Sequence, residues 1–287
     1  MDKVVLNARA KINLSLDVTG RRDNGYHDVR MIMQSIDLYD EIEIRRTEEG
    51  IALESEGSPV SDEKDNLIYK AARLIMDEMS VKEGVHIKYK KNIPVAAGMA
   101  GGSSDAASVF KGINELFDLG LTVERLCELG VKIGADVPYC IMGGTALSEG
   151  IGEILTPLPK MPECSILIAK PDISVSTAYV YTAFDDLKEK NHPDVDGMIA
   201  AIREGSLRKV SDLLGNSLEG VTQEEYPIIK ELKELMLGNK AMGALMSGSG
   251  PTVFGLFEKC DEALEAEEKI KGTGLAKDLL VTAPYNA

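Results

Sequence analysis

The segment IPVAAGMAGGSSDAAS, residues 93–108, runs from an apolar stretch through a glycine-rich bend into an expected helix. The bend contains Gly98, Gly101 and Gly102, and Ser103-Ser104-Asp105 open the helix. Glycine permits a positive φ and lets a ligand touch the main chain, while a helix N-terminus presents unpaired N–H groups with partial positive charge. The bend therefore indicates either an anion site suited to phosphate or a tight strand–helix connection without a ligand.

The bend does not match two widespread nucleotide-binding patterns. A Walker A loop would continue with Gly-Lys-Ser/Thr, whereas the next lysine here is Lys111, well inside the expected helix. The GxGxxG pattern and its ribose-binding acid are also absent, which argues against a dinucleotide-dependent oxidoreductase. Two functions remain open for the Ser104 hydroxyl, which could bind a magnesium ion or cap the helix.

Composition excludes several functional classes. Of the 287 residues, 32 are Lys or Arg and 47 are Asp or Glu, giving a net charge of −15. Such an acidic chain is not expected to bind nucleic acid or anionic membranes, and no apolar run approaches the roughly 18 residues of a membrane helix. The four cysteines form no CxxC pair and the three histidines no HExxH motif, so we expect no zinc site or disulfide framework. We predict a reducing cytoplasm, with the cysteines as core residues.

Hydrophobic periodicity predicts an α+β chain in two parts. Strand-like alternation covers 3–18, 31–46, 84–95 and 166–171, and strand, glycine turn and strand follow in 242–257. Helical spacing covers 66–79, 104–117, 121–134, 194–204, 206–218, 225–237 and 261–271, with Asp65 or Asn66 as the first N-cap. The proline-rich segment 156–164 is the best candidate for a boundary, so we predict domains at residues 1–160 and 161–287.

Three separated segments resemble motifs of the GHMP small-molecule kinases, in the order expected for that family. They are AKINLSLDVTGRRDNGYHDV, PVAAGMAGGSSDAA and GALMSGSGPTVFGLF. The resemblance implies a two-domain α+β fold, a left-handed βαβ crossover in the first domain, and an active site in the cleft between domains. It also implies Mg²⁺ and ATP, with the triphosphate wrapped by Pro94, Ala96, Ala97, Gly98, Met99, Ala100, Gly101, Gly102, Ser103 and Ser104.

Two charged residues match the family's catalytic positions. By sequence alone, Lys11 is better explained as a solvated strand lysine, and Asp136 as a turn aspartate between a helix and an apolar strand. The resemblance implies that Asp136 orients the acceptor hydroxyl and takes its proton, while Lys11 neutralises the transferring phosphoryl group. Asn13 is a candidate partner and substrate ligand, although ordinary strand polarity also explains it.

The GYH motif concerns the substrate. The resemblance implies that Tyr26 and His27 hold a cytosine ring, with Tyr181 on its other face in preference to Tyr179 or Phe184. The predicted activity is ATP-dependent phosphorylation of the 2-hydroxyl of a cytidyl-linked polyol, a small molecule. The alternatives are a homoserine, mevalonate or sugar kinase of the same family, or a catalytically silent sensor. The turn SGSGPT (247–252) reads as a plain hairpin or as a segment closing the site, and the oligomeric state stays open.

Overall fold

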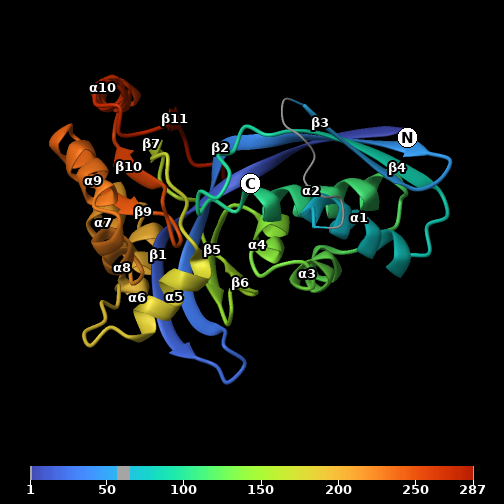
Figure 1. Ribbon diagram of the computed structural model, residues 1–287, viewed down its shortest axis with the longest axis horizontal. Helices are drawn as coiled ribbons and strands as arrows, with labels where there is room; N and C mark the ends of the chain where they lie inside the picture. The colour runs from blue at the N-terminus through green and yellow to red at the C-terminus, as the bar shows by residue number, and fades with distance from the viewer. Residues whose placement is uncertain (1, 57–64, 287) are drawn as a thin grey trace. The chain divides into compact units, whose positions relative to one another are not determined.

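The computed structural model describes residues 2–56 and 65–286 (Figure 1). Its residues form two compact units that interleave along the sequence. The first unit comprises Met1–Ala10, Leu38–Ile93 and Ala100–Gly143, and the second comprises Lys11–Asp37, Pro94–Met99 and Gly144–Ala287. The long strands β1 (Lys3–Arg21) and β2 (His27–Thr47) therefore contribute residues to both units. The division at residues 160 and 161 stays a prediction.

The first unit is a sheet covered by helices. Strand β4 (Gly84–Lys90) pairs antiparallel with the C-terminal part of β2 and parallel with β3 (Ile51–Glu56). Alternate residues of β4 are buried and pack with helices α1 (Leu67–Glu78) and α2 (Gly101–Leu116) in one core. As predicted, the side chain of Asn66 caps α1, accepting a hydrogen bond from the Ile68 N–H. This core supports the helix whose N-terminus follows the glycine-rich bend.

Strand β3, helix α1 and strand β4 form a βαβ unit, because β3 and β4 are parallel neighbours with α1 between them in the chain. Helix α1 packs against α2 and also contacts β3. The sequence did not predict β3, whose residues alternate between half-buried and exposed at the edge of the sheet. The left hand of the crossover stays a prediction.

Two further helices end the first unit. The predicted helix at 121–134 is confirmed as α3 (Val123–Val131), which is capped by the Thr122 hydroxyl. The next apolar segment was expected to be a strand, and that expectation is wrong, because it forms α4 (Val137–Met142) packed against α2 and α3. A six-residue apolar run carries no clear period, and Pro138 near its start fits the first turn of a helix.

In the second unit, short strands pair with the C-terminal part of β1 and the N-terminal part of β2. Strand β5 (Thr145–Glu149) pairs antiparallel with β2 and with β6 (Ile154–Pro157). Strand β8 (Gly215–Asn216) pairs parallel with β1 at Ser15 and Leu16. Lys11 and Asn13 lie on β1 shortly before the residues that pair with β8, and both are buried.

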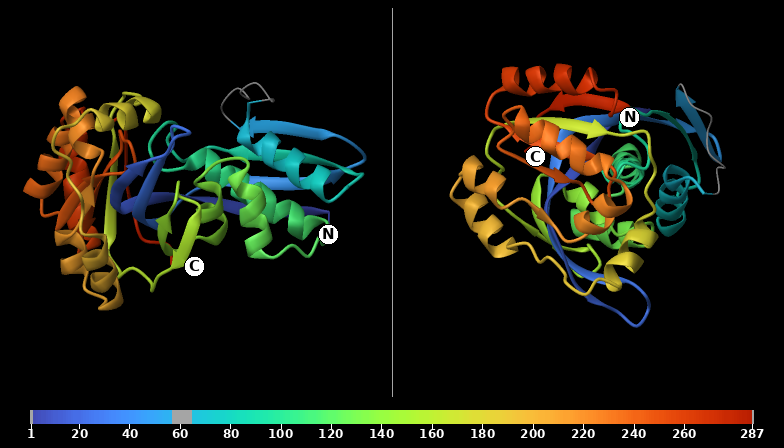
Figure 2. Two further views of the ribbon diagram at one scale, coloured as in Figure 1. Left: turned by 90° about the horizontal axis from the view of Figure 1, so that it is seen from below. Right: turned by 60° about the vertical axis from the view of Figure 1, so that its left-hand side comes forward.

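The second unit also contains a separate four-stranded antiparallel sheet, in the order β11-β7-β10-β9. Helices α9 (Ile228–Gly238) and α10 (Cys260–Lys271) lie next to each other and pack on this sheet (Figure 2). The predicted strand, turn and strand at 242–257 is confirmed, because β9 and β10 pair as a hairpin around SGSGPT. The strand bounds are Ser165–Lys170 (β7), Gly243–Met246 (β9), Val253–Phe257 (β10) and Asp278–Thr282 (β11).

Four more helices lie in the second unit, and two of them were not predicted. Helix α6 (Val195–Arg203) is confirmed, but the predicted helix at 206–218 is wrong beyond Asp212, where α7 (Leu207–Asp212) ends before β8. The unpredicted helices are α5 (Thr177–Asp185), capped by Ser176, and α8 (Glu219–Glu225). No helix among the described residues is long and apolar enough to cross a membrane.

None of the four cysteines is in a disulfide, but they are not all core residues as expected. Cys164 is buried, Cys127 and Cys140 are half-buried, and Cys260 is exposed. Cys260 begins helix α10 at the surface, where its side chain fills no core space. The interpretation of all four as core residues is therefore wrong for Cys260.

Candidate active site

The glycine-rich bend takes an unusual backbone path. Ala96, Gly98 and Ala100 have φ angles of 52°, 71° and 57°, all in the left-handed region. Gly101 and Gly102 do not share this conformation, because they already belong to the first turn of α2. Of these three glycines, only Gly98 uses the positive φ that glycine permits. Two alanines instead adopt the costly conformation, which persists only where its surroundings impose it.

Helix α2 begins three residues earlier than the sequence indicated. Its N-cap is Ala100, which provides no side-chain cap, and its first turn contains no acidic residue. Ser104 is inside the helix, with its N–H bonded to the Ala100 carbonyl, so the alternative in which Ser104 is the N-cap is wrong. The main-chain N–H groups of Gly101, Gly102 and Ser103 belong to the first turn of α2, where N–H groups have no acceptor within the helix. This uncapped N-terminus fits a phosphate group.

Gly98 contacts the turn between β9 and β10, within the second unit. An added Cβ on Gly98 would lie 2.3 Å from the Ser247 carbonyl oxygen. The Gly98 carbonyl accepts hydrogen bonds from Lys11 Nζ at 3.1 Å and from Ser247 Oγ at 3.1 Å. The turn SGSGPT is therefore more than a plain hairpin, because it packs directly on the bend.

Lys11 and Asn13 lie together on β1, two residues apart and hence on the same face of the strand. Lys11 is 5% exposed and its Nζ donates to Asn13 Oδ1 at 2.7 Å. The Asn13 amide nitrogen contacts Met31 Sδ at 3.3 Å, so both ends of this amide are engaged. The main-chain N–H of Lys11 also donates to the Met99 carbonyl at 3.2 Å. Burial with these contacts excludes the solvated-lysine interpretation.

Asp136 belongs to the first unit and occupies the N-cap position of α4. Its backbone is helical, with φ −81° and ψ −14°, and its half-buried side chain does not cap the helix. Both the turn interpretation of Asp136 and its catalytic role stay predictions.

Ser104 is 2% exposed and its hydroxyl donates to the Arg9 carbonyl at 2.6 Å, in the first unit. Over the described ranges, no group of three or more His, Cys, Asp or Glu residues is arranged to hold a metal ion. The role of Ser104 as a magnesium ligand stays a prediction.

The second unit brings His27 and Tyr181 together, although 154 positions separate 27 from 181 in the chain. Their ring centroids are 4.9 Å apart with an interplanar angle of 35°. Tyr26, which precedes His27 in the chain, is 58% exposed, so its ring is available to a ligand. Tyr179 instead donates to Glu225 at 3.2 Å, and Phe184 is buried. Among the three candidate aromatics, the ring contact to His27 favours Tyr181.

Asp185 is a residue of this group that sequence reasoning missed. Its Oδ1 lies 2.8 Å from His27 Nε2, and its Oδ2 lies 3.3 Å from Arg21 Nη1. A carboxylate on Nε2 places a hydrogen on that nitrogen and so fixes the orientation of the imidazole ring. The only sequence signal was its position one helical turn after Tyr181.

Comparison with known proteins shows the family to which this chain belongs. The model of the GHMP kinases N terminal domain matches residues 66–144, and that of the GHMP kinases C terminal domain matches residues 198–274. The chain belongs to the GHMP kinase family and has its mixed α+β, two-domain architecture. A kinase of this family uses ATP, which agrees with the uncapped N-terminus of α2.

Individual relatives show which kinases of this family the chain is similar to in sequence and structure. The chain is 49% identical to the 4-diphosphocytidyl-2-C-methyl-D-erythritol kinase of Lachnospira eligens over 286 residues, 99% of each chain. It is also 49% identical to the enzyme of the same name from Caldicellulosiruptor saccharolyticus, over 93% of each chain. A crystal structure of 4-(cytidine 5'-diphospho)-2C-methyl-D-erythritol kinase matches with a TM-score of 0.85 at 31% identity, covering 99% of this chain and 100% of that one. Homoserine kinase from Cytophaga hutchinsonii, at 18% identity and a TM-score of 0.79, shares the fold.

Proposed function

We propose that the chain phosphorylates the 2-hydroxyl of 4-diphosphocytidyl-2-C-methyl-D-erythritol with ATP, in the non-mevalonate route to isoprenoid precursors. The observation that carries this proposal is 49% identity, over 99% of both chains, to a kinase named for that substrate. The contact between His27 and Tyr181 adds support, because it places aromatic and hydrogen-bonding groups together next to an exposed tyrosine.

Asp136 and Lys11 are the proposed catalytic residues. Asp136 orients the acceptor hydroxyl and takes its proton as the oxygen bonds to the phosphoryl group and ADP leaves. Lys11 neutralises the charge on the phosphoryl oxygens, and Asn13 holds its ammonium group through the 2.7 Å hydrogen bond. Buried charges of this kind are pre-organised, so little reorientation is needed when the charge moves.

The residues from Pro94 to Ser104 are the proposed nucleotide loop. Its support is the uncapped N-terminus of α2 and the left-handed residues Ala96, Gly98 and Ala100, which turn the main chain ahead of it. We propose that the main-chain amides of Gly101, Gly102 and Ser103 bind the phosphates of ATP. A magnesium ion would bind the phosphate oxygens, with Ser104 as a protein ligand.

Tyr26, His27 and Tyr181 are the proposed cytosine site. Tyr26 and Tyr181 stack on the two faces of the base, and His27 bonds to the edge that distinguishes cytosine from uracil. Asp185 keeps the His27 ring in place through the 2.8 Å contact. We place the reaction in the cytoplasm, in keeping with four cysteines that form no disulfide, with a small-molecule substrate and no nucleic-acid or membrane partner.

The test is turnover of ATP with a panel of acceptors. The panel contains the cytidyl substrate, its uridyl analogue, the nucleotide-free polyol, mevalonate and homoserine, with phosphorylated product detected directly. We expect kcat/KM to be highest for the cytidyl substrate. Equal values for the cytidyl, uridyl and nucleotide-free acceptors would refute the cytidine assignment, and preference for mevalonate or homoserine would establish a different kinase of the family.

A further inference from the structure

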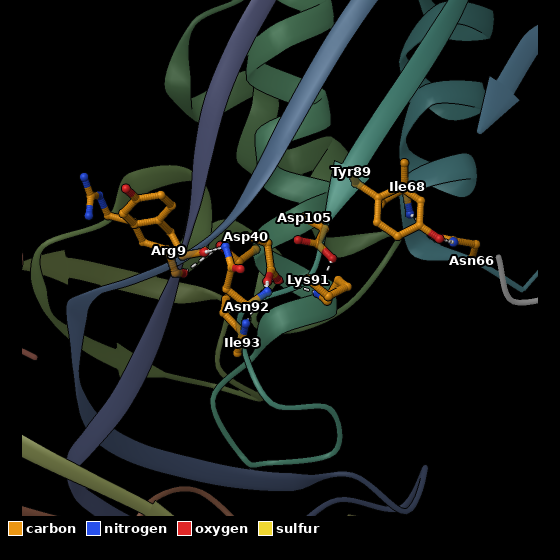
Figure 3. Close-up of polar contacts among 11 residues, drawn as sticks. Arg9, Asp40, Asn66, Ile68, Tyr89, Lys91, Asn92, Ile93 and Asp105 are labelled. Atoms are coloured by element: carbon orange, nitrogen blue, oxygen red, sulfur yellow. Dashed lines mark hydrogen bonds and ion pairs between the residues drawn. The ribbon is translucent and has the colours of Figure 1, made fainter. Parts of the chain in front are cut away.

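A buried cluster of three charged side chains lies at the base of the nucleotide loop, within the first unit (Figure 3). Lys91 Nζ contacts Asp40 Oδ2 and also donates to Asp105 Oδ2 at 2.6 Å. Asp40 is fully buried and Asp105 is 4% exposed, while the Lys91 side chain retains 21% of its exposure. The catalytic assignments above use none of these three residues.

Asp40 holds the segment that enters the loop. Its Oδ1 accepts hydrogen bonds from the main-chain N–H groups of Asn92 at 2.5 Å and Ile93 at 2.8 Å. The Asn92 side chain donates to the Tyr39 carbonyl at 2.9 Å. Three consecutive residues, 91–93, are thus attached to strand β2 immediately before the loop begins at Pro94.

Asp105 holds the segment that leaves the loop. It is the fifth residue of α2, next to Ser104, whose hydroxyl donates to the Arg9 carbonyl. The two ends of the loop also approach each other directly. An added Cβ on Gly101 would lie 3.2 Å from Ile93 Cγ2 and 3.5 Å from Lys91 Nζ. Lys91 therefore connects the entering and leaving segments through its two carboxylate contacts.

Two carboxyl groups face one ammonium group in this cluster, so its charges would not balance if both acids were ionised. Burial, together with the charge of Asp40, raises the pKa of Asp105 to about 8, although Lys91 acts in the opposite direction. Asp105 Oδ1 is buried and has no hydrogen-bond partner among the described residues. The ion pair of Asp40 with Lys91 would be complete without Asp105, and a surplus buried acid does not stabilise a fold. Stability alone therefore does not explain why an acid stands at position 105.

We propose that Asp105 is a positioning residue for nucleotide binding, which acts through Lys91 to hold the two ends of loop 94–100 at a fixed separation. This inference rests on the proposed role of that loop in binding ATP. Asp105 touches neither substrate. It constrains the main chain on both sides of the amides that receive the phosphates. The loop is then ordered before ATP binds, which lowers the entropic cost of binding.

The experiment compares Asp105→Ala and Asp105→Asn with the wild type. Equilibrium binding of a non-hydrolysable ATP analogue is measured by calorimetry, together with steady-state kinetics and the thermal midpoint. We expect Asp105→Ala to weaken analogue binding and to raise KM for ATP roughly tenfold, the size of one coupling between contacting residues. The kcat and the KM for the acceptor should stay within about twofold. Asp105→Asn retains an oxygen for Lys91 and should restore most of the affinity.

Asp77→Ala is the matched control, because Asp77 forms an exposed ion pair with Arg73 on α1 in the same unit. It should leave analogue binding unchanged. If Asp105→Ala does not fold, Asp105→Val takes its place, because it puts an apolar group of closer size at position 105 and leaves the ion pair of Lys91 with the buried Asp40 intact. Valine accepts no hydrogen bond from Lys91, so this variant should weaken analogue binding about as much as Asp105→Ala.

Two results would overturn the proposal. One is analogue binding within twofold of wild type in folded Asp105→Ala. The other is a parallel loss of kcat, acceptor binding and thermal midpoint, which would make Asp105 a purely structural residue. A wild-type protein that binds ATP but prefers another acceptor would refute the proposed substrate and leave the loop result decisive. A wild-type protein that binds no ATP would overturn both.

Discussion

Asp136 is the side chain with the most direct chemical consequence. Asp136→Asn keeps the volume of the side chain and removes its ability to take a proton, so turnover should fall roughly 10²–10⁴-fold. Binding of the ATP analogue should change little, because the substitution leaves α2 and the loop intact. The measurement is kcat with saturating substrates, with Asp77→Asn as the control at an exposed site. Turnover within threefold of wild type would remove Asp136 from the mechanism.

The cysteines provide a test of burial that is independent of catalysis. Burial raises the pKa of the Cys164 thiol to about 12, while Cys260 is exposed at the start of α10. Because the thiolate is the reactive form, Cys164 should stay unmodified from pH 7 to pH 9 in the folded protein. Cys260 should react with a thiol reagent over the same range, because it is exposed. Peptide mapping after labelling, with and without denaturant, checks both sites, and labelling of native Cys164 at a rate similar to Cys260 would contradict this packing.

The backbone path of the bend at 94–100 depends on Gly98. Gly98→Ala would place a Cβ 2.3 Å from the Ser247 carbonyl at a φ of 71°, so the bend or the turn SGSGPT must move. We expect analogue binding to weaken more than tenfold and unfolding to become easier by about 1–3 kcal/mol. Calorimetry and urea denaturation measure the two effects.

Two other glycines serve as controls for that prediction. Gly25→Ala shares a positive φ but has open space around its Cβ, so it should carry the strain without affecting nucleotide binding. Gly238→Ala, at the end of α9, has no positive φ and open space around its Cβ, so it should be tolerated. If either control impaired binding as much as Gly98→Ala, the contact of Gly98 with Ser247 would not be the cause of the loss.

The proposed cytosine site takes its residues from two parts of the second unit. These parts are the tip of the β1–β2 hairpin and helix α5. Tyr26→Ala should raise KM for the cytidyl substrate roughly 5- to 150-fold, from a stacking energy of about 1–3 kcal/mol per base. The kcat should change less, because the base is remote from the transferred group. Tyr179→Ala is the control, since Tyr179 pairs with Glu225 instead. An equal rise in KM for both variants would show that Tyr26 has no special role.

Local pattern was sufficient for much of the fold. The alternation of β1, the Asn66 cap of α1 and the hairpin of β9 and β10 all follow from residues close together in the chain. The short helix α4 was misread as a strand, because six apolar residues fit either structure until they pack on α2 and α3. The resemblance to a family, and not periodicity, singled out Lys11 and Asp136.

The sequence by itself determined the kind of chain, the order of its main elements and the motifs that identify a GHMP kinase. Contacts between distant residues were decided only by the tertiary structure. Asp185 meets His27 across 158 positions, and Asp40 meets Lys91 across 51. The left-handed Ala96 and Ala100 likewise run against local preference and are held by their surroundings. The physical reason is the same in each case, because burial and hydrogen bonding between separated segments outweigh what any residue prefers alone.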